Sequence, residues 1–160
     1  MGDDFSIMTE ERVKQARKFF QNDYNCAQSV LKALLSDSTI DIEPHELTNV
    51  VAGFGAGVAH QGLACGAVSG AIAAIGLIFG RELKDVEEHK ETTYDIAEKF
   101  VQRFEEKHGT IICDELTGIK MKDRDLREKA RQDGIYSNKC PAFVESAVRI
   151  ALELTSNPDQ

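Results

Sequence analysis

Apolar residues recur at helical spacing near the start of the chain. Between residues 8 and 22 the apolar positions lie three and four apart, which predicts an amphipathic helix. Thr9 is the candidate N-cap of this helix. The same spacing predicts a second helix, which Asn25 caps and which ends at residues 36–38.

Two prolines and one long periodic stretch indicate further helices. A proline is favoured in the first turn, where its missing N–H would have no partner, so Pro44 predicts a helix start and Pro141 predicts a last helix over residues 141–154. The longest periodic stretch predicts a helix over residues 84–109, and a charged helix is expected over residues 122–132. No segment has the alternation of a strand.

The middle of the chain is uncharged. From residue 47 to residue 80 the sequence has no Asp, Glu, Lys or Arg. Its length would permit a membrane span, but Gly62 and His60 interrupt it, and its one long helix, residues 65–80, is shorter than a span requires. A helix that is apolar on all sides is expected at the centre of a bundle. The sequence therefore predicts an all-α, single-domain helical bundle with an apolar Gly/Ala-rich central helix.

Composition narrows the class of protein further. The chain has 160 residues, 27 acidic and 19 basic, and a net charge of −8, which argues against nucleic acid or an anionic membrane as a partner. We expect one domain over residues 1–160, with flexible ends at 1–7 and 156–160. No secretory signal is visible at the N-terminus, so we expect a reducing, cytoplasmic compartment. There, functional cysteines are more often redox centres or metal ligands than structural bridges.

All four cysteines fall at predicted helix N-termini: Cys26, Cys65, Cys113 and Cys140. The positive end of a helix dipole and its unpaired N–H groups stabilise a thiolate. The thiolate is the nucleophilic, metal-binding and redox-active form of cysteine. The alternative is that some of these residues are small buried side chains, as free cysteine often is.

No two cysteines in the sequence have the spacing Cys-x-x-Cys. This excludes a zinc ribbon, a ferredoxin loop and a thioredoxin motif, so any shared site must be assembled by the fold. His60 lies in the Gly-rich loop before Cys65. It could donate a hydrogen bond to sulfur or serve as an additional ligand, or its ring could be satisfied by the backbone.

These residues resemble a family of redox-active proteins named for its cysteine pattern. The pattern is a first Cys, then Cys-Gly-Ala-x-x-Gly, then two further cysteines; here these are Cys26, residues 65–70, Cys113 and Cys140. The resemblance spans about 13–154, with a charged stretch at 120–132 as its one departure. Relatives of the family include the iron–sulfur portion of split-Soret cytochromes, which implies a cysteine-bound cluster. Its members also tend to be encoded near transporters, which implies a membrane transporter as a partner.

Three functions follow from this pattern. The first is electron transfer to a redox partner protein through a [2Fe–2S]-type cluster held by the four cysteines, with N–H groups of Gly62 and Gly66 tuning its potential. The second is a cofactor-free thiol/disulfide oxidoreductase or redox sensor. The third is a helical interaction module in which the cysteines bind structural Zn²⁺ or fill the core. A homodimer seam along the apolar centre stays open.

Overall fold

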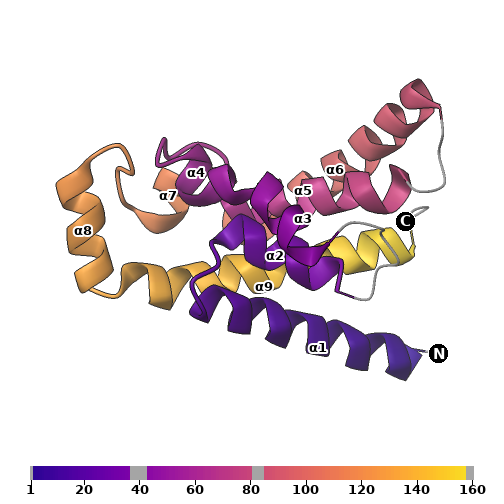
Figure 1. Cartoon of the computed structure of the whole chain (residues 1–160), viewed down its shortest axis with the longest axis horizontal. Helices are drawn as coiled ribbons and strands as arrows, with labels where there is room; N and C mark the ends of the chain where they lie inside the picture. Colours follow the sequence, from indigo (N-terminus) through magenta and orange to yellow (C-terminus); the bar gives the residue numbers. More distant parts are fainter. Residues whose placement is uncertain (1, 37–42, 81–84, 158–160) are drawn as a thin grey trace.

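The regular structure of the protein is helical (Figure 1). The computed structural model describes residues 2–36, 43–80 and 85–157. Within these ranges no strand forms, and an isolated β-bridge joins Ala64 to Ile112. The predicted all-α class is therefore confirmed. In chain order the elements are α1 (Gly2–Gln21), α2 (Cys26–Leu34), α3 (Pro44–Val50), η1 (Ala52–Phe54), α4 (Gly55–Val58), α5 (Gly66–Gly80), α6 (Val86–His108), α7 (Cys113–Thr117), α8 (Arg124–Gln132) and α9 (Ile135–Ser156).

The central helix is α5, as the uncharged sequence predicts. None of its residues is fully exposed, and Ala67, Ala71 and Ile75 are completely buried. It packs against α2, α6 and α9. Its apolar surface is therefore covered by other helices of the same chain. Among the described helices, none combines the length and the apolar character that crossing a bilayer requires.

The outer helices enclose α5 and leave one end of the molecule to short elements. Helices α1 and α9 run side by side along the protein (Figure 1), and an ion pair between Arg17 and Glu145 at 2.9 Å joins them. Figure 1 shows α4, α7 and α8 gathered at one end, with the beginning of α1 and the last turns of α9 at the other. The candidate site described below lies at the end of the molecule that these short elements form.

Most predicted helix starts are confirmed. Asn25 caps α2 in a capping box: its side chain accepts from the N–H of Gln28, and the Gln28 side chain accepts from the N–H of Asn25. Helix α3 begins at Pro44. Helices α6 and α8 follow the aspartate caps Asp85 and Asp123. Helix α2 ends at Leu34, two residues before the expected end at 36–38, of which residues 37 and 38 lie outside the described ranges.

The predicted start of the first helix is wrong. Helix α1 begins at Gly2 rather than at residue 8, so Thr9 lies inside it and is not its N-cap. Asp3 and Asp4 fall in the first turn, where their charges favour the helix N-terminus. Flexibility at 1–7 and 156–160 stays a prediction.

The predicted start of the last helix is also wrong. Helix α9 begins at Ile135, so Cys140 and Pro141 lie within it. The break from α8 is made by Gly134, whose φ of 72° is readily adopted by glycine. Pro141 removes one helical N–H, which leaves the carbonyl of Ser137 without its usual partner. Because Ser137 is exposed, water can take that place.

Candidate functional site

All four cysteines line one cavity of about 280 Å³. They reach it from different elements: Cys26 begins α2, Cys65 immediately precedes α5, Cys113 begins α7 and Cys140 lies within α9. Cys65 and Cys113 are buried, whereas Cys26 and Cys140 are partly exposed. The remaining lining residues are Phe20, Asn25, Ala56, His60, Leu116, Thr117, Met121, Arg127, Arg131, Tyr136 and Phe143. The fold therefore brings together cysteines that are far apart in sequence.

Two glycines explain how α2 comes so close to α5. A Cβ placed on Gly66 would lie 2.3 Å from Cys26 Sγ, and one on Gly70 would lie 2.4 Å from the carbonyl oxygen of Ala27. Real Cβ atoms do not tolerate such distances. The glycines of the Cys-Gly-Ala-x-x-Gly motif thus leave room for the first cysteine and for the helix that carries it.

The β-bridge places the next two cysteines beside each other. The N–H of Cys65 donates to the carbonyl of Ile111 at 2.7 Å, and the N–H of Cys113 donates to the carbonyl of Leu63 at 2.7 Å. These bonds fix the entry of α5 against the entry of α7. The pairing is too short to leave a strand pattern in the sequence, which is why sequence reasoning missed it.

Cys140 reaches the cavity from within α9, in the second turn of the helix. Tyr136, Cys140 and Phe143 are four and three residues apart, so they share one face of α9, and all three line the cavity. The predicted helix-start position of Cys140 is therefore wrong, because Pro141 does not begin the helix. Its place in the cavity comes from helical periodicity and not from a helix N-terminus.

A left-handed backbone segment forms part of the cavity wall. Residues 56–60 all have positive φ, from 49° at Ala59 to 67° at Gly57, and only one of them is glycine. At each of the other residues this conformation costs about 1–2 kcal/mol of free energy. Such strain persists where the surroundings fix it. Here Asn25 Nδ2 donates to the carbonyl of Ala52 at 2.8 Å, and the N–H of Leu63 donates to the carbonyl of Gly57.

Cys26 is the cysteine whose thiolate is best stabilised. A hydrogen bond from the Cys65 thiol lowers the pKa of Cys26 to about 7, against the opposing effect of burial, and backbone N–H groups of Ala56 and Ala27 lower it further. One donor thus comes from the left-handed segment and another from the first turn of α2. At neutral pH a large fraction of Cys26 is the nucleophilic thiolate.

The other three cysteines are held as thiols. Donating its hydrogen bond to Cys26 raises the pKa of Cys65, and burial raises it further. Burial raises the pKa of Cys113 and of Cys140 to about 12, and the nearby Cys26 charge acts in the same direction. The cavity therefore combines one ionisable nucleophile with protonated neighbours.

The other predicted site residues, His60 and Gly62, differ in whether they line the cavity. His60 lines the cavity but is exposed, and it belongs to the left-handed segment. Gly62 does not line the cavity, and its N–H donates to the carbonyl of Ala56 at 3.3 Å rather than to sulfur. A Cβ at Gly62 would meet Asp114 Oδ1 at 1.9 Å, so its role here is close packing. Among the described residues, no three ligating side chains are grouped as a metal ion would require.

Sequence reasoning missed the residues that α8 adds to the site. Arg127 and Arg131 line the cavity, although the charged stretch that contains them is a departure from the family pattern. Their spacing of four places them on one helix face, and this was the available signal. Phe20 and Phe143 add aromatic side chains to the lining.

Together these features define a class: a helical protein with four cysteines around one partly buried cavity. The family described as "Putative redox-active protein (C_GCAxxG_C_C)" matches residues 24–154, and the chain belongs to this family. The family name and the chain share a first cysteine, a central motif of Cys, Ala and Gly, and two further cysteines; the name writes the central motif as Gly-Cys-Ala-x-x-Gly, and residues 65–70 of the chain read Cys-Gly-Ala-Val-Ser-Gly. No curated protein and no solved structure matches the chain.

Proposed function

We propose that this redox-active protein works through a dithiol/disulfide pair formed by Cys26 and Cys65. The observation that carries the proposal is the placement of the two residues: both line one cavity, and Cys26 Sγ lies against Gly66, the residue that follows Cys65. Two cysteines placed next to each other in this way need only a small movement to form a bond. The nucleophile is ionised near neutral pH, and its partner retains the proton, as stepwise thiol–disulfide exchange requires.

The reaction has two steps. The Cys26 thiolate attacks one sulfur of a substrate disulfide, forming a mixed disulfide and releasing the first substrate thiolate. The Cys65 thiol then loses its proton and attacks Cys26 Sγ, which forms the Cys26–Cys65 disulfide and releases the second substrate thiol. The substrate gains two electrons, which the cysteine pair loses; the Cys65 proton passes to the second substrate sulfur, and the first leaves as a thiolate.

A [2Fe–2S]-type cluster is the second candidate, and the convergence of all four cysteines on one cavity favours it. The donor set fits in kind, because four cysteine sulfurs are the usual ligands of such a cluster. The spacing does not fit, since no three ligating side chains in the described ranges are grouped for a metal. We therefore assign no step to a cluster.

The test compares four single variants, each with one cysteine replaced by serine. After mild oxidation of the wild type, we expect two of the four thiols to disappear and peptide mass spectrometry to find Cys26 linked to Cys65. C26S and C65S should abolish this disulfide. C113S and C140S are the matched controls, because they line the same cavity outside the pair, and both should retain it. A disulfide that joins other cysteines would overturn the proposal.

The same variants test the second candidate. Anaerobic purification, a visible absorption spectrum and quantification of iron and acid-labile sulfide show whether a cluster is bound. If a cluster is bound by all four cysteines, each of the four variants should lose iron and sulfide. Cluster stoichiometry in the wild type, with no Cys26–Cys65 disulfide on oxidation, would replace the dithiol proposal with electron transfer.

A further inference from the structure

We propose that the cavity binds a small disulfide carrying a negative charge, with Arg127 and Arg131 of α8 holding that charge while Cys26 attacks the sulfur. This inference rests on the proposed function and specifies its substrate class. It comes from the charge, the size and the wall chemistry of the cavity. It assigns α8 a role in choosing the substrate.

The charge of the cavity is opposite to that of the chain. The protein has a net charge of −8, yet the described lining contains two arginines and no Asp or Glu. A charged group on the substrate would therefore meet guanidinium groups, the side chains that pair best with planar carboxylates.

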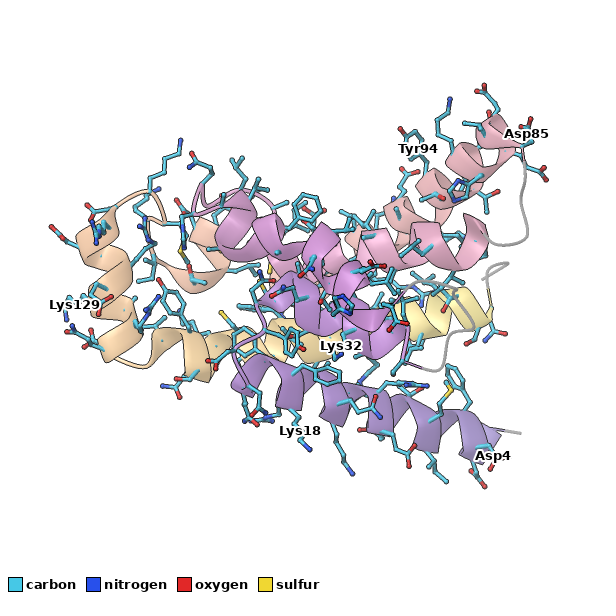
Figure 2. The ribbon with its side chains drawn as sticks, in the orientation of Figure 1. Asp4, Lys18, Lys32, Asp85, Tyr94 and Lys129 are labelled. Carbon is cyan, nitrogen blue, oxygen red and sulfur yellow. The ribbon has the colours of Figure 1, made fainter. Side chains whose placement is uncertain are left out.

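Arg131 is placed to accept a ligand. It is exposed, and within the described ranges it forms no ion pair with a carboxylate. Its neighbour Lys129 extends outward from α8 (Figure 2) and is paired with Asp133 at 2.7 Å. Lys129 on the outer face is thus paired with Asp133, whereas Arg131 at the cavity is available to a ligand.

Arg127 is held in place by the loop before α8. Its Nη1 donates to the carbonyl of Met121, and the Tyr136 hydroxyl donates to the carbonyl of Arg127 at 3.4 Å. These bonds tie α8 to the cavity wall and to α9. Arg127 therefore supplies a fixed positive charge, whereas Arg131 provides free donors. Together they make an anchored and an adjustable contact for one anion.

The size and the walls favour a small molecule over a folded partner. A cavity of about 280 Å³ is near the lower end of the range for small-ligand pockets. Phe20, Leu116, Met121 and Phe143 give it apolar walls that suit the carbon skeleton and the disulfide sulfurs of a ligand. A protein disulfide would reach Cys26 only if its chain entered this space.

The experiment compares two chromogenic disulfides that differ in charge. One is 5,5′-dithiobis(2-nitrobenzoate), which carries a carboxylate on each half, and the other is 4,4′-dithiodipyridine, which is uncharged at neutral pH. Stopped-flow absorbance gives the rate constant for each probe with reduced protein at pH 7. The fast phase is assigned to Cys26 by its absence in C26S. The ratio of the two rate constants reports anion preference independently of thiol reactivity.

Substitutions on α8 separate the cavity charge from the net charge. R131Q should lower the rate with the anionic probe by roughly tenfold and leave the neutral probe within about twofold. R131K, which retains the charge, should keep most of the preference. R124Q is the matched control, because Arg124 lies on the same helix, is exposed and does not line the cavity. It should leave the ratio unchanged.

The outcomes distinguish this inference from the proposed function. If R131Q and R124Q give the same ratio as the wild type while the Cys26–Cys65 disulfide still forms, the substrate inference is overturned and the dithiol function stands. If the anion preference depends on Arg131 but oxidation joins other cysteines, the anion site is supported and the dithiol pair is overturned. Peptide mapping of the oxidised product decides between these results.

Discussion

The sulfur of Cys26 lies where a side chain at residue 66 would begin, because a Cβ on Gly66 would be 2.3 Å from Cys26 Sγ. The first cysteine of the family pattern therefore fills the space left by the glycine that follows the second. Cys65 and Gly66 therefore pack together with Cys26 as one unit. This relationship also places Cys26 beside the residue that follows Cys65.

Replacing Gly66 by alanine should raise the pKa of Cys26. The added Cβ displaces Cys26 Sγ and weakens the hydrogen bond from Cys65 that lowers this pKa to about 7. We expect alkylation of Cys26 by iodoacetamide to move to higher pH. The control is Gly76→Ala on the same helix, whose added Cβ meets only a Thr93 methyl group at 3.7 Å. Equal pH profiles for the two variants would contradict this account.

Replacing Gly70 by alanine should mainly reduce stability. Its Cβ would lie 2.4 Å from the carbonyl oxygen of Ala27, and this backbone atom cannot move without separating α2 from α5. Overpacking of this kind costs about 1–3 kcal/mol. Urea unfolding measures the loss, and Gly76→Ala again serves as the control, expected to be neutral or to stabilise by about 0.5–1 kcal/mol. A Gly70→Ala variant as stable as Gly76→Ala would exclude close packing at this crossing.

Glycine in the left-handed segment should stabilise the protein. Ala59 is exposed and has a φ of 49°, so Ala59→Gly removes a steric penalty of about 1 kcal/mol without removing a buried contact. Ala52→Gly is the control, since this exposed residue lies in the neighbouring 3₁₀ helix η1 and outside the residues with positive φ. It should be neutral or destabilising. Thermal unfolding of the two variants gives the comparison, and the same sign of change in both would count against backbone strain.

The cysteines should make stability depend on pH in two opposite ways. The folded pKa of Cys26, about 7, is below the usual thiol value of 9.0, so its contribution is present above pH 9 and is lost as pH falls through 7. The difference in unfolding free energy between wild type and C26S should therefore increase from pH 7 to pH 9. Urea unfolding under reducing conditions measures it. A difference that does not change with pH would show that the Cys26 thiolate is not stabilised by folding.

Cys140 should show the opposite dependence. Burial raises its pKa to about 12, so the folded state retains a proton that the unfolded state releases above the usual value of 9.0. Its contribution to stability is complete below pH 9 and decreases as pH rises toward 12. We expect the difference between wild type and C140S to decrease above pH 9. An increase over that range would contradict the burial of this thiol.

The sequence by itself determined most of the helices and the cap of α2, but not the starts of α1 and α9. Periodicity and capping chemistry act between residues a few positions apart, so the Asn25 capping box, the start at Pro44 and the central position of α5 were predictable. Where two local signals competed, the prediction was wrong. Pro141 looked like a helix start, but the break at Gly134 sets the boundary, and the proline is accommodated inside α9.

Only the tertiary structure decided that the cysteines share one cavity. Their convergence depends on the close crossing at Gly66, on the bridge between Ala64 and Ile112, and on the face of α9 that carries Cys140. Each of these contacts joins segments that are distant along the chain. The left-handed segment and the arginines of α8 also depend on the tertiary structure, because they line the cavity only once the helices pack. Local patterns fix elements, whereas the chemistry of this site depends on which elements meet.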